Sequence, residues 1–150
     1  MPLDITNTEH LAELVSAKHQ VLKVLVQLSR RQIEIIEAGE MSTLIKLLAA
    51  KQTVMTQLQA IEHELAPFRA DEPEQRRWQS PSRRAACQAQ AESASTLLAE
   101  ALKLEQQAEA AMLHRRDSAA EALAAVQLAS DARGAYVTAP VTIPSVHAEG

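Results

Sequence analysis

Two stretches of this chain decide its fold: residues 11–35, LAELVSAKHQVLKVLVQLSRRQIEI, and residues 44–65, LIKLLAAKQTVMTQLQAIEHEL. In each stretch, positions that alternate three and four residues apart form a mostly apolar stripe. The first stripe consists of Leu11, Leu14, Lys18, Val21, Leu25, Leu28, Gln32 and Ile35. The second stripe consists of Leu44, Leu47, Lys51, Val54, Leu58, Ile61 and Leu65. Because this spacing keeps one face of a long helix turned towards a partner helix, it predicts helices of a coiled coil or helical bundle.

Composition favours the same fold class. The 150 residues include three glycines, one Phe, one Trp and one Tyr. Few turns are therefore available, and the core must consist of Leu, Ile, Val, Met and Ala, which suits a thin helical bundle. A chain of this length forms one domain with one core. The composition thus predicts an all-α domain.

Charge and cysteine content exclude several classes of partner and site. The net charge of −4 gives no reason to expect a nucleic acid partner. Cys87 is the only cysteine, which excludes an internal disulfide and a multi-cysteine metal site. The opening residues, MPLDITN, lack the basic flank and apolar centre of a signal peptide. No run approaches the roughly 18 apolar residues of a spanning helix, so we expect a cytoplasmic protein without membrane insertion.

The first two helices are predicted at about residues 8–38 and 42–66. A side chain between Thr6 and Thr8 caps the first helix, and Gly39 ends it in a left-handed conformation. Ser42 caps the second helix, and Pro67 ends it because proline has no N–H to donate. The short join at Gly39 favours an antiparallel hairpin over one bent rod.

A connector and a third helix complete the predicted bundle. The polar connector at 67–82 is expected to press Phe68 and Trp78 against the bundle, and Ser82 then caps a helix at about 82–134. Eighteen of the 51 residues from Ala85 to Ala135 are alanines, the residue with the highest helix propensity. We therefore predict an antiparallel bundle of three long helices in one domain, residues 1–136, followed by a flexible, disordered tail at 137–150.

Three polar residues interrupt the two stripes: Lys18, Gln32 and Lys51. A buried polar residue at such a position can fix the register of packed helices at a cost in stability. A lysine at the edge of the bundle can instead pack its stem and keep its ammonium in water. We favour the edge for both lysines, and both alternatives stay open.

No residue pattern points to catalysis. None of the five histidines has a Glu three residues before it, the pairing that di-iron helical bundles need. The neighbours Glu62, His63 and Glu64 point in different directions on a helix. Cys87 has no identified base or second thiol. We therefore expect a protein that is not an enzyme and has no metal site and no cofactor.

The sequence around the first break is more specific. Residues 36–44, IEAGEMSTL, are followed by an apolar run that reaches Lys51. This arrangement resembles the flagellar export chaperones of the FlgN family, in which a long first helix ends at a Gly–acidic pair followed by a Leu and, seven residues on, a Lys. Gly39, Glu40, Leu44 and Lys51 match, although the acid is Glu rather than the more usual Asp. The segment 115–136, which ends in Tyr136, is similar to the family's last helix, so the resemblance covers about residues 8–136.

The resemblance implies a cytoplasmic chaperone for hook–filament junction proteins. Such a chaperone binds the amphipathic C-terminal helix of its client, prevents premature self-association and delivers the client to the export gate protein FlhA. The family uses a C-terminal tyrosine at the gate, which implies gate docking by Tyr136.

The small-residue stripe of the third helix suggests where a client helix would bind, because alanines permit close approach of a partner helix. The predicted client-helix contacts are Leu97, Leu98, Ala101, Leu104, Ala108, Met112 and Leu123. Packing of these residues on the first two helices is the open alternative. The rival function is a structural coiled-coil protein that self-associates through its stripes, for example as a homodimer.

Overall fold

The computed structural model describes residues 4–147, with side chains up to Tyr136. These residues form three α-helices and one 3-10 turn, and they contain no strand. The helices are α1 (Ile5–Ala38), α2 (Met41–Arg69) and α3 (Pro81–His147), and the turn η1 (Pro73–Gln75) lies between α2 and α3. The predicted all-α class with three long helices is therefore confirmed.

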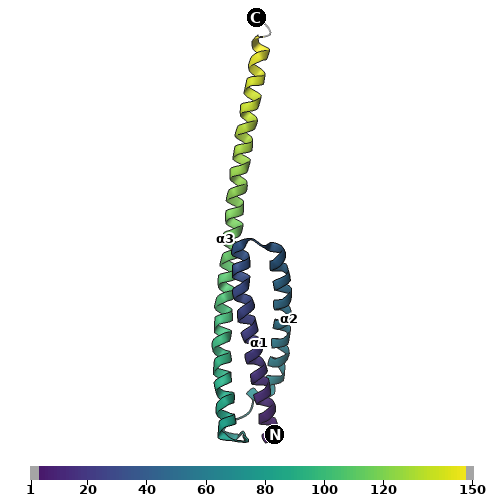
Figure 1. Cartoon of the computed structure of the whole chain (residues 1–150), viewed down its shortest axis with the longest axis vertical. Helices are drawn as coiled ribbons and strands as arrows, with labels where there is room; N and C mark the ends of the chain where they lie inside the picture. Colours follow the sequence, from purple (N-terminus) through teal and green to yellow (C-terminus); the bar gives the residue numbers. More distant parts are fainter. Residues whose placement is uncertain (1–3, 148–150) are drawn as a thin grey trace. The chain divides into compact units, whose positions relative to one another are not determined.

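The chain divides into two compact units, Met1–Ala111 and Met112–Gly150, here called unit 1 and unit 2. Within unit 1, α1, α2 and the first part of α3 lie side by side (Figure 1). The turn at Gly39 lies at one end of these helices and the connector with η1 lies at the other (Figure 1).

The ends of α1 follow from local hydrogen bonds. Asp4 caps the helix by accepting from the Asn7 backbone N–H at 2.9 Å, so the predicted capping by Thr6 to Thr8 is wrong. Thr8 instead donates its hydroxyl to the Arg77 carbonyl oxygen at 2.6 Å, which ties α1 to the connector. The predicted end at Gly39 is confirmed: φ is 74°, and the N–H groups of Gly39 and Glu40 donate to the last carbonyls of α1.

The predicted end of α2 at Ala66 is wrong, because the helix continues through Pro67 to Arg69. The missing proline N–H leaves only the carbonyl of His63, four residues earlier, without its helical partner, and this loss is smaller near a helix end than in a helix interior. The predicted cap of α3 is also shifted: the Ser80 hydroxyl accepts from the Arg83 N–H at 3.2 Å. Pro81 then occupies the first helical position, where its fixed φ suits the helix.

The core of unit 1 consists of three clusters that follow one another along the helices. The cluster next to the Gly39 turn contains Ile35, Ile36, Leu44, Leu47 and Ala108. The middle cluster contains Leu22, Leu25, Val26, Val54, Leu58, Ala94 and Ala101. The cluster next to the connector contains Leu11, Leu14, Val15, Leu65 and Cys87, with Phe68 and Trp78 packed against it. The predicted packing of both connector aromatics is therefore confirmed.

Buried residues that lie seven positions apart explain how α1 contacts both α2 and α3. Besides the stripe read from the sequence, α1 carries a second buried line: Thr8, Val15, Leu22, Ser29 and Ile36. On α3, the residues Cys87, Ala94, Ala101 and Ala108 form a buried line of small side chains with the same spacing. Small residues at a helix contact permit a short distance between the helix axes. The alanines of this line therefore suit close packing of α3 within unit 1.

Unit 2 is helical up to His147. The predicted helix end near Gly134 and the predicted flexible tail at 137–150 therefore differ from the structure over residues 137–147, and residues 148–150 lie outside the described part. Pro140 and Pro144 lie within this helical stretch, and each of them removes one backbone donor from the helix.

Candidate functional site

A groove of about 390 Å³ lies between α2 and α3, with α1 as its floor. Most of its lining is apolar: Leu25, Leu48, Met55, Leu58, Leu98, Ala101 and Leu102. Its polar lining residues are Ser29, Lys51, Gln52 and Glu105. Since a cavity of about 150 Å³ can hold a benzene ring, the groove has room for two or three apolar side chains.

The groove walls carry leucines that no core cluster covers. Leu48 on α2 is 41% exposed, and Leu98 and Leu102 on α3 are 37% and 61% exposed. They lie on opposite walls of a groove whose deeper lining, at Leu25 on α1 and Leu58 on α2, is buried. The surface is thus an apolar channel between two helices, open to solvent.

Lys51 lines this groove and links all three helices. It is 9% exposed and donates to the Gln32 side-chain oxygen on α1 at 2.8 Å. It also forms an ion pair with Glu105 on α3. For Lys51 and Gln32 the buried alternative therefore holds, and the favoured edge position is wrong for this lysine. Lys18 does lie at an edge, where it pairs with Glu62 at 2.7 Å.

Ser29 is the polar residue in the floor of the groove. Its side chain is 1% exposed, and its hydroxyl oxygen has no hydrogen-bond partner among the described residues. Thr8 occupies the same line of α1 and has a partner in the Arg77 carbonyl. A buried hydroxyl without a hydrogen-bond partner lowers the stability of the fold. Ser29 is therefore an unfavourable residue for the fold alone.

The structure separates the predicted client contacts into three groups. Leu98 and Ala101 line the groove. Leu97 and Leu104 pack against the middle core cluster, and Ala108 is buried in the cluster next to the Gly39 turn. Leu97, Leu104 and Ala108 therefore follow the alternative of packing within the bundle. Ala101 does both, because it is buried in the middle cluster and also lines the groove.

The remaining predicted contacts lie in unit 2. Met112 and Leu123 are exposed there, as are Val126 and Leu128. Tyr136, the predicted gate-docking residue, is 78% exposed. No residue from 112 to 136 is buried, so the described side chains of unit 2 have no core of their own.

Sequence reasoning missed the α2 wall and the α1 floor of the groove. The signal was present on α2, because Leu48 and Met55 lie seven residues apart, one position after the stripe residues Leu47 and Val54. Such a parallel row of apolar residues indicates a second helix contact. On α1, the line that contains Ser29 had the same spacing and could have been found by the same test.

Two titratable groups outside the groove, Glu62 and Cys87, have pKa values that their neighbours and their burial shift. Burial raises the pKa of Glu62, but hydrogen bonds and charge from Lys18 and Arg69 outweigh it, so the net pKa lies below the ordinary value of 4.5. Burial raises the pKa of the Cys87 thiol, although Arg76 lowers it in part. A raised thiol pKa opposes a nucleophilic role.

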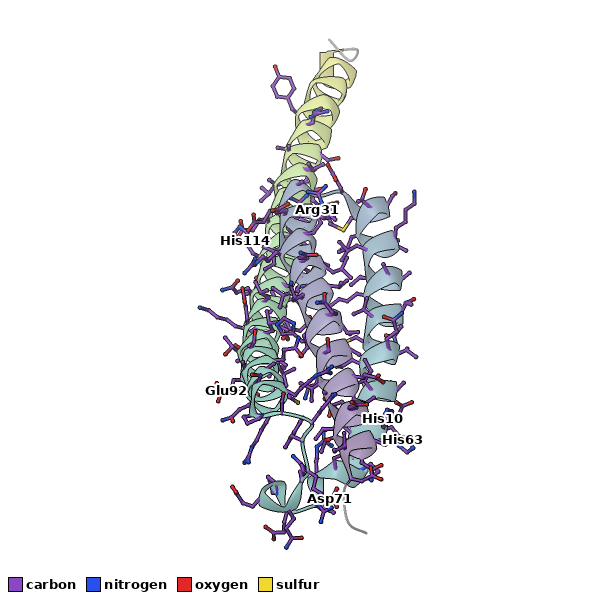
Figure 2. All side chains as sticks on the ribbon, turned by 60° about the horizontal axis from the view of Figure 1, so that its bottom comes forward. His10, Arg31, His63, Asp71, Glu92 and His114 are labelled. Carbon is purple, nitrogen blue, oxygen red and sulfur yellow. The ribbon has the colours of Figure 1, made fainter. Side chains whose placement is uncertain are left out.

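The histidines do not form a site in the described part of the chain. Figure 2 shows His10 on α1 and His63 on α2 near the end of unit 1 that contains Asp71. His10 lies against the Phe68 ring, with 6.1 Å between ring centroids. His19 pairs with the Ser93 hydroxyl at 2.9 Å. Among the described residues, no three His, Cys, Asp or Glu side chains gather in a way that could hold a metal ion.

Comparisons of the chain with protein-family models, with curated proteins and with solved structures found no match. Within residues 4–147, no helix combines the length and the apolar character needed to cross a lipid bilayer.

Proposed function

We propose that this protein is a cytoplasmic export chaperone that binds an amphipathic helix of its client in the groove between α2 and α3. The observation that carries the proposal is the row of exposed leucines on both walls of this groove, Leu48, Leu98 and Leu102, above a buried apolar floor. Helix-in-groove recognition uses apolar anchors spaced three and four residues apart on the bound helix. The volume of the groove suits two or three such anchors.

The arrangement proposed for unit 1 is an antiparallel bundle. Support comes from the order of residues in the three core clusters: members from α1 and α3 rise in number from the connector to the Gly39 turn, while members from α2 fall. A bound client helix would lie along α2 and α3 and become a fourth helix of the bundle.

The flagellar assignment rests on the resemblance to FlgN-like chaperones at Gly39, Glu40, Leu44 and Lys51. On this basis, the clients are hook–filament junction proteins, which the chaperone keeps from premature self-association. Tyr136 then engages the cytosolic domain of the gate protein FlhA. Its exposure supports this role, because an exposed tyrosine offers an apolar ring and a hydroxyl to a partner.

A charge placed on the groove wall tests client binding. Leu102→Glu should weaken binding of the C-terminal segment of a junction protein at least tenfold, because the carboxylate would lose water on client binding. Val24→Glu is the matched control, since Val24 is a half-exposed apolar residue of α1 outside the groove. Equal binding by the two variants, measured by calorimetry, would exclude this groove as the client site.

Tyr136→Ala tests gate docking. We expect unchanged thermal stability and client affinity, together with weaker binding to the cytosolic domain of FlhA. Unchanged FlhA affinity would remove Tyr136 from the proposal, and a large fall in melting temperature would assign it a structural role instead.

Self-association through exposed stripes is the second candidate function. The exposed Leu123 and Val126 of unit 2, which are three residues apart on one side of α3, favour it, because an uncovered apolar face is stabilised by contact with another helix. Light scattering distinguishes the two functions. A chaperone should form a complex of defined stoichiometry with the junction-protein segment, whereas a structural coiled coil should form a stable oligomer alone and ignore the segment.

A further inference from the structure

We propose that the groove selects a client helix that carries one side-chain amide, Asn or Gln, among its apolar anchors. The Ser29 hydroxyl forms a hydrogen bond with this amide. This inference rests on the proposed function, because it concerns a helix bound in the same groove. It identifies the polar chemistry that such a helix must bring.

The first argument is the position of Ser29. Its hydroxyl lies in the floor of an otherwise apolar part of the groove, is almost fully buried and has no partner within residues 4–147. This hydroxyl is already shielded from water in the unbound protein, so the cost of an unpaired buried polar group is present before a client binds. A client with a hydrogen-bonding group at this point removes that cost.

The second argument comes from Lys51, which lines the same groove. Its ammonium has three donors, and the Gln32 side chain and Glu105 accept two hydrogen bonds from it. One donor of Lys51 therefore remains in a groove that Ser29 also lines, and the Ser29 hydroxyl can both donate and accept. The groove thus offers two polar positions within an apolar surface.

An amide matches this pair better than other side chains do. Its oxygen accepts from Lys51 or Ser29, and its NH₂ group donates to the Ser29 oxygen. A carboxylate would lose its hydration beside the negative charge of Glu105, and a lysine would meet Lys51. A single buried amide among apolar residues is also a common way to fix the register of packed helices. The same contact would therefore set the position of the client along the groove.

Two synthetic peptides of about 20 residues test the inference. Both carry leucines spaced three and four apart, and they differ only at the central stripe position, which is Asn in one peptide and Leu in the other. Fluorescence anisotropy gives the affinities of both peptides for the full-length protein and for its Ser29→Ala and Ser42→Ala variants. Ser42 is the matched control, because it is an exposed serine of α2 outside the groove.

The readout is the ratio of the affinities for the Asn peptide and the Leu peptide. Because each protein meets the same two peptides, their different helix propensities cancel when ratios are compared. We expect Ser29→Ala to lower the ratio about tenfold relative to the unaltered protein, and Ser42→Ala to leave it unchanged. An equal ratio for the unaltered protein and Ser29→Ala overturns the inference, but binding of either peptide then leaves the proposed function standing. If neither peptide binds the unaltered protein, both proposals fail.

Discussion

The buried contact between Lys51 and Gln32 allows a quantitative test of how the three helices are held together. Lys51→Met keeps an apolar stem of similar length but removes the ammonium that Gln32 and Glu105 contact. A hydrogen bond that involves a charged group contributes about 1.5–3 kcal/mol. The ion pair adds at most about 1 kcal/mol, because the Glu105 side chain is 58% exposed. The desolvation of the lysine offsets part of this sum.

We therefore expect Lys51→Met to lower the free energy of unfolding by about 2 kcal/mol, which corresponds to a fall in melting temperature of about 4–8 °C for a chain of this size. Most of the loss comes from the Gln32 oxygen, which stays buried without a donor. The double variant Gln32→Leu/Lys51→Met removes this unpaired oxygen and should recover most of the stability, since replacing both partners by apolar groups is nearly neutral.

Urea unfolding followed by circular dichroism measures both effects. Lys46→Met, at an exposed lysine of α2, is the control and should change stability by less than about 0.5 kcal/mol. The reasoning is refuted if Lys51→Met behaves like this control. It is also refuted if the double variant loses the sum of the two single effects, because independent residues add and coupled residues do not.

Three further predictions concern other parts of unit 1. Gly39→Ala should cost about 1 kcal/mol in urea unfolding, because the φ of 74° is strained for any residue with a Cβ; an unchanged midpoint would contradict this reading of the turn. The lowered pKa of Glu62 stabilises the fold above the ordinary Glu pKa of 4.5, and this contribution is lost as the pH falls through the folded pKa. Lys18→Met should raise the Glu62 pKa in an NMR titration and flatten that acid dependence. The Cys87 thiol, buried and with a raised pKa, should react slowly with a thiol reagent in the native protein and quickly in urea; fast native labelling would place it at the surface.

The sequence was sufficient for the fold class and for most of the core, because the three–four spacing reports directly which face of a helix is covered. Leu11, Leu14, Leu25 and Ile35 of the first stripe are buried as expected. The predicted stripe did not include Leu22 and Ile36, which are more deeply buried than any of these four residues. They belong to a second line of α1, and one stripe does not reveal that a helix contacts two neighbours at once.

The errors at the helix ends and the failure to predict the groove have different physical causes. Asp4 and Ser80 cap their helices in place of nearby Thr6, Thr8 and Ser82, and several candidate caps within a few residues differ by less free energy than tertiary contacts supply. The groove was missed for a different reason. A groove is formed by residues of three separate segments. A second apolar row on α1 or α2 indicates a further helix contact, but the packing of the helices decides which rows meet.

The turn at Gly39 has a consequence for the order of folding. The cluster beside it joins Ile36 and Leu44, which are close in sequence, whereas the cluster beside the connector joins Leu11, Leu65 and Cys87, which are far apart. The entropy lost on closing a chain segment grows with its length, so the contacts beside the turn are the least costly to form first. We expect α1 and α2 to associate from the turn towards Thr8, and α3 to dock afterwards. Amide hydrogen exchange should then be slowest around Ile36 and faster around Leu11, and the groove, which needs all three helices, should be the last part of unit 1 to form.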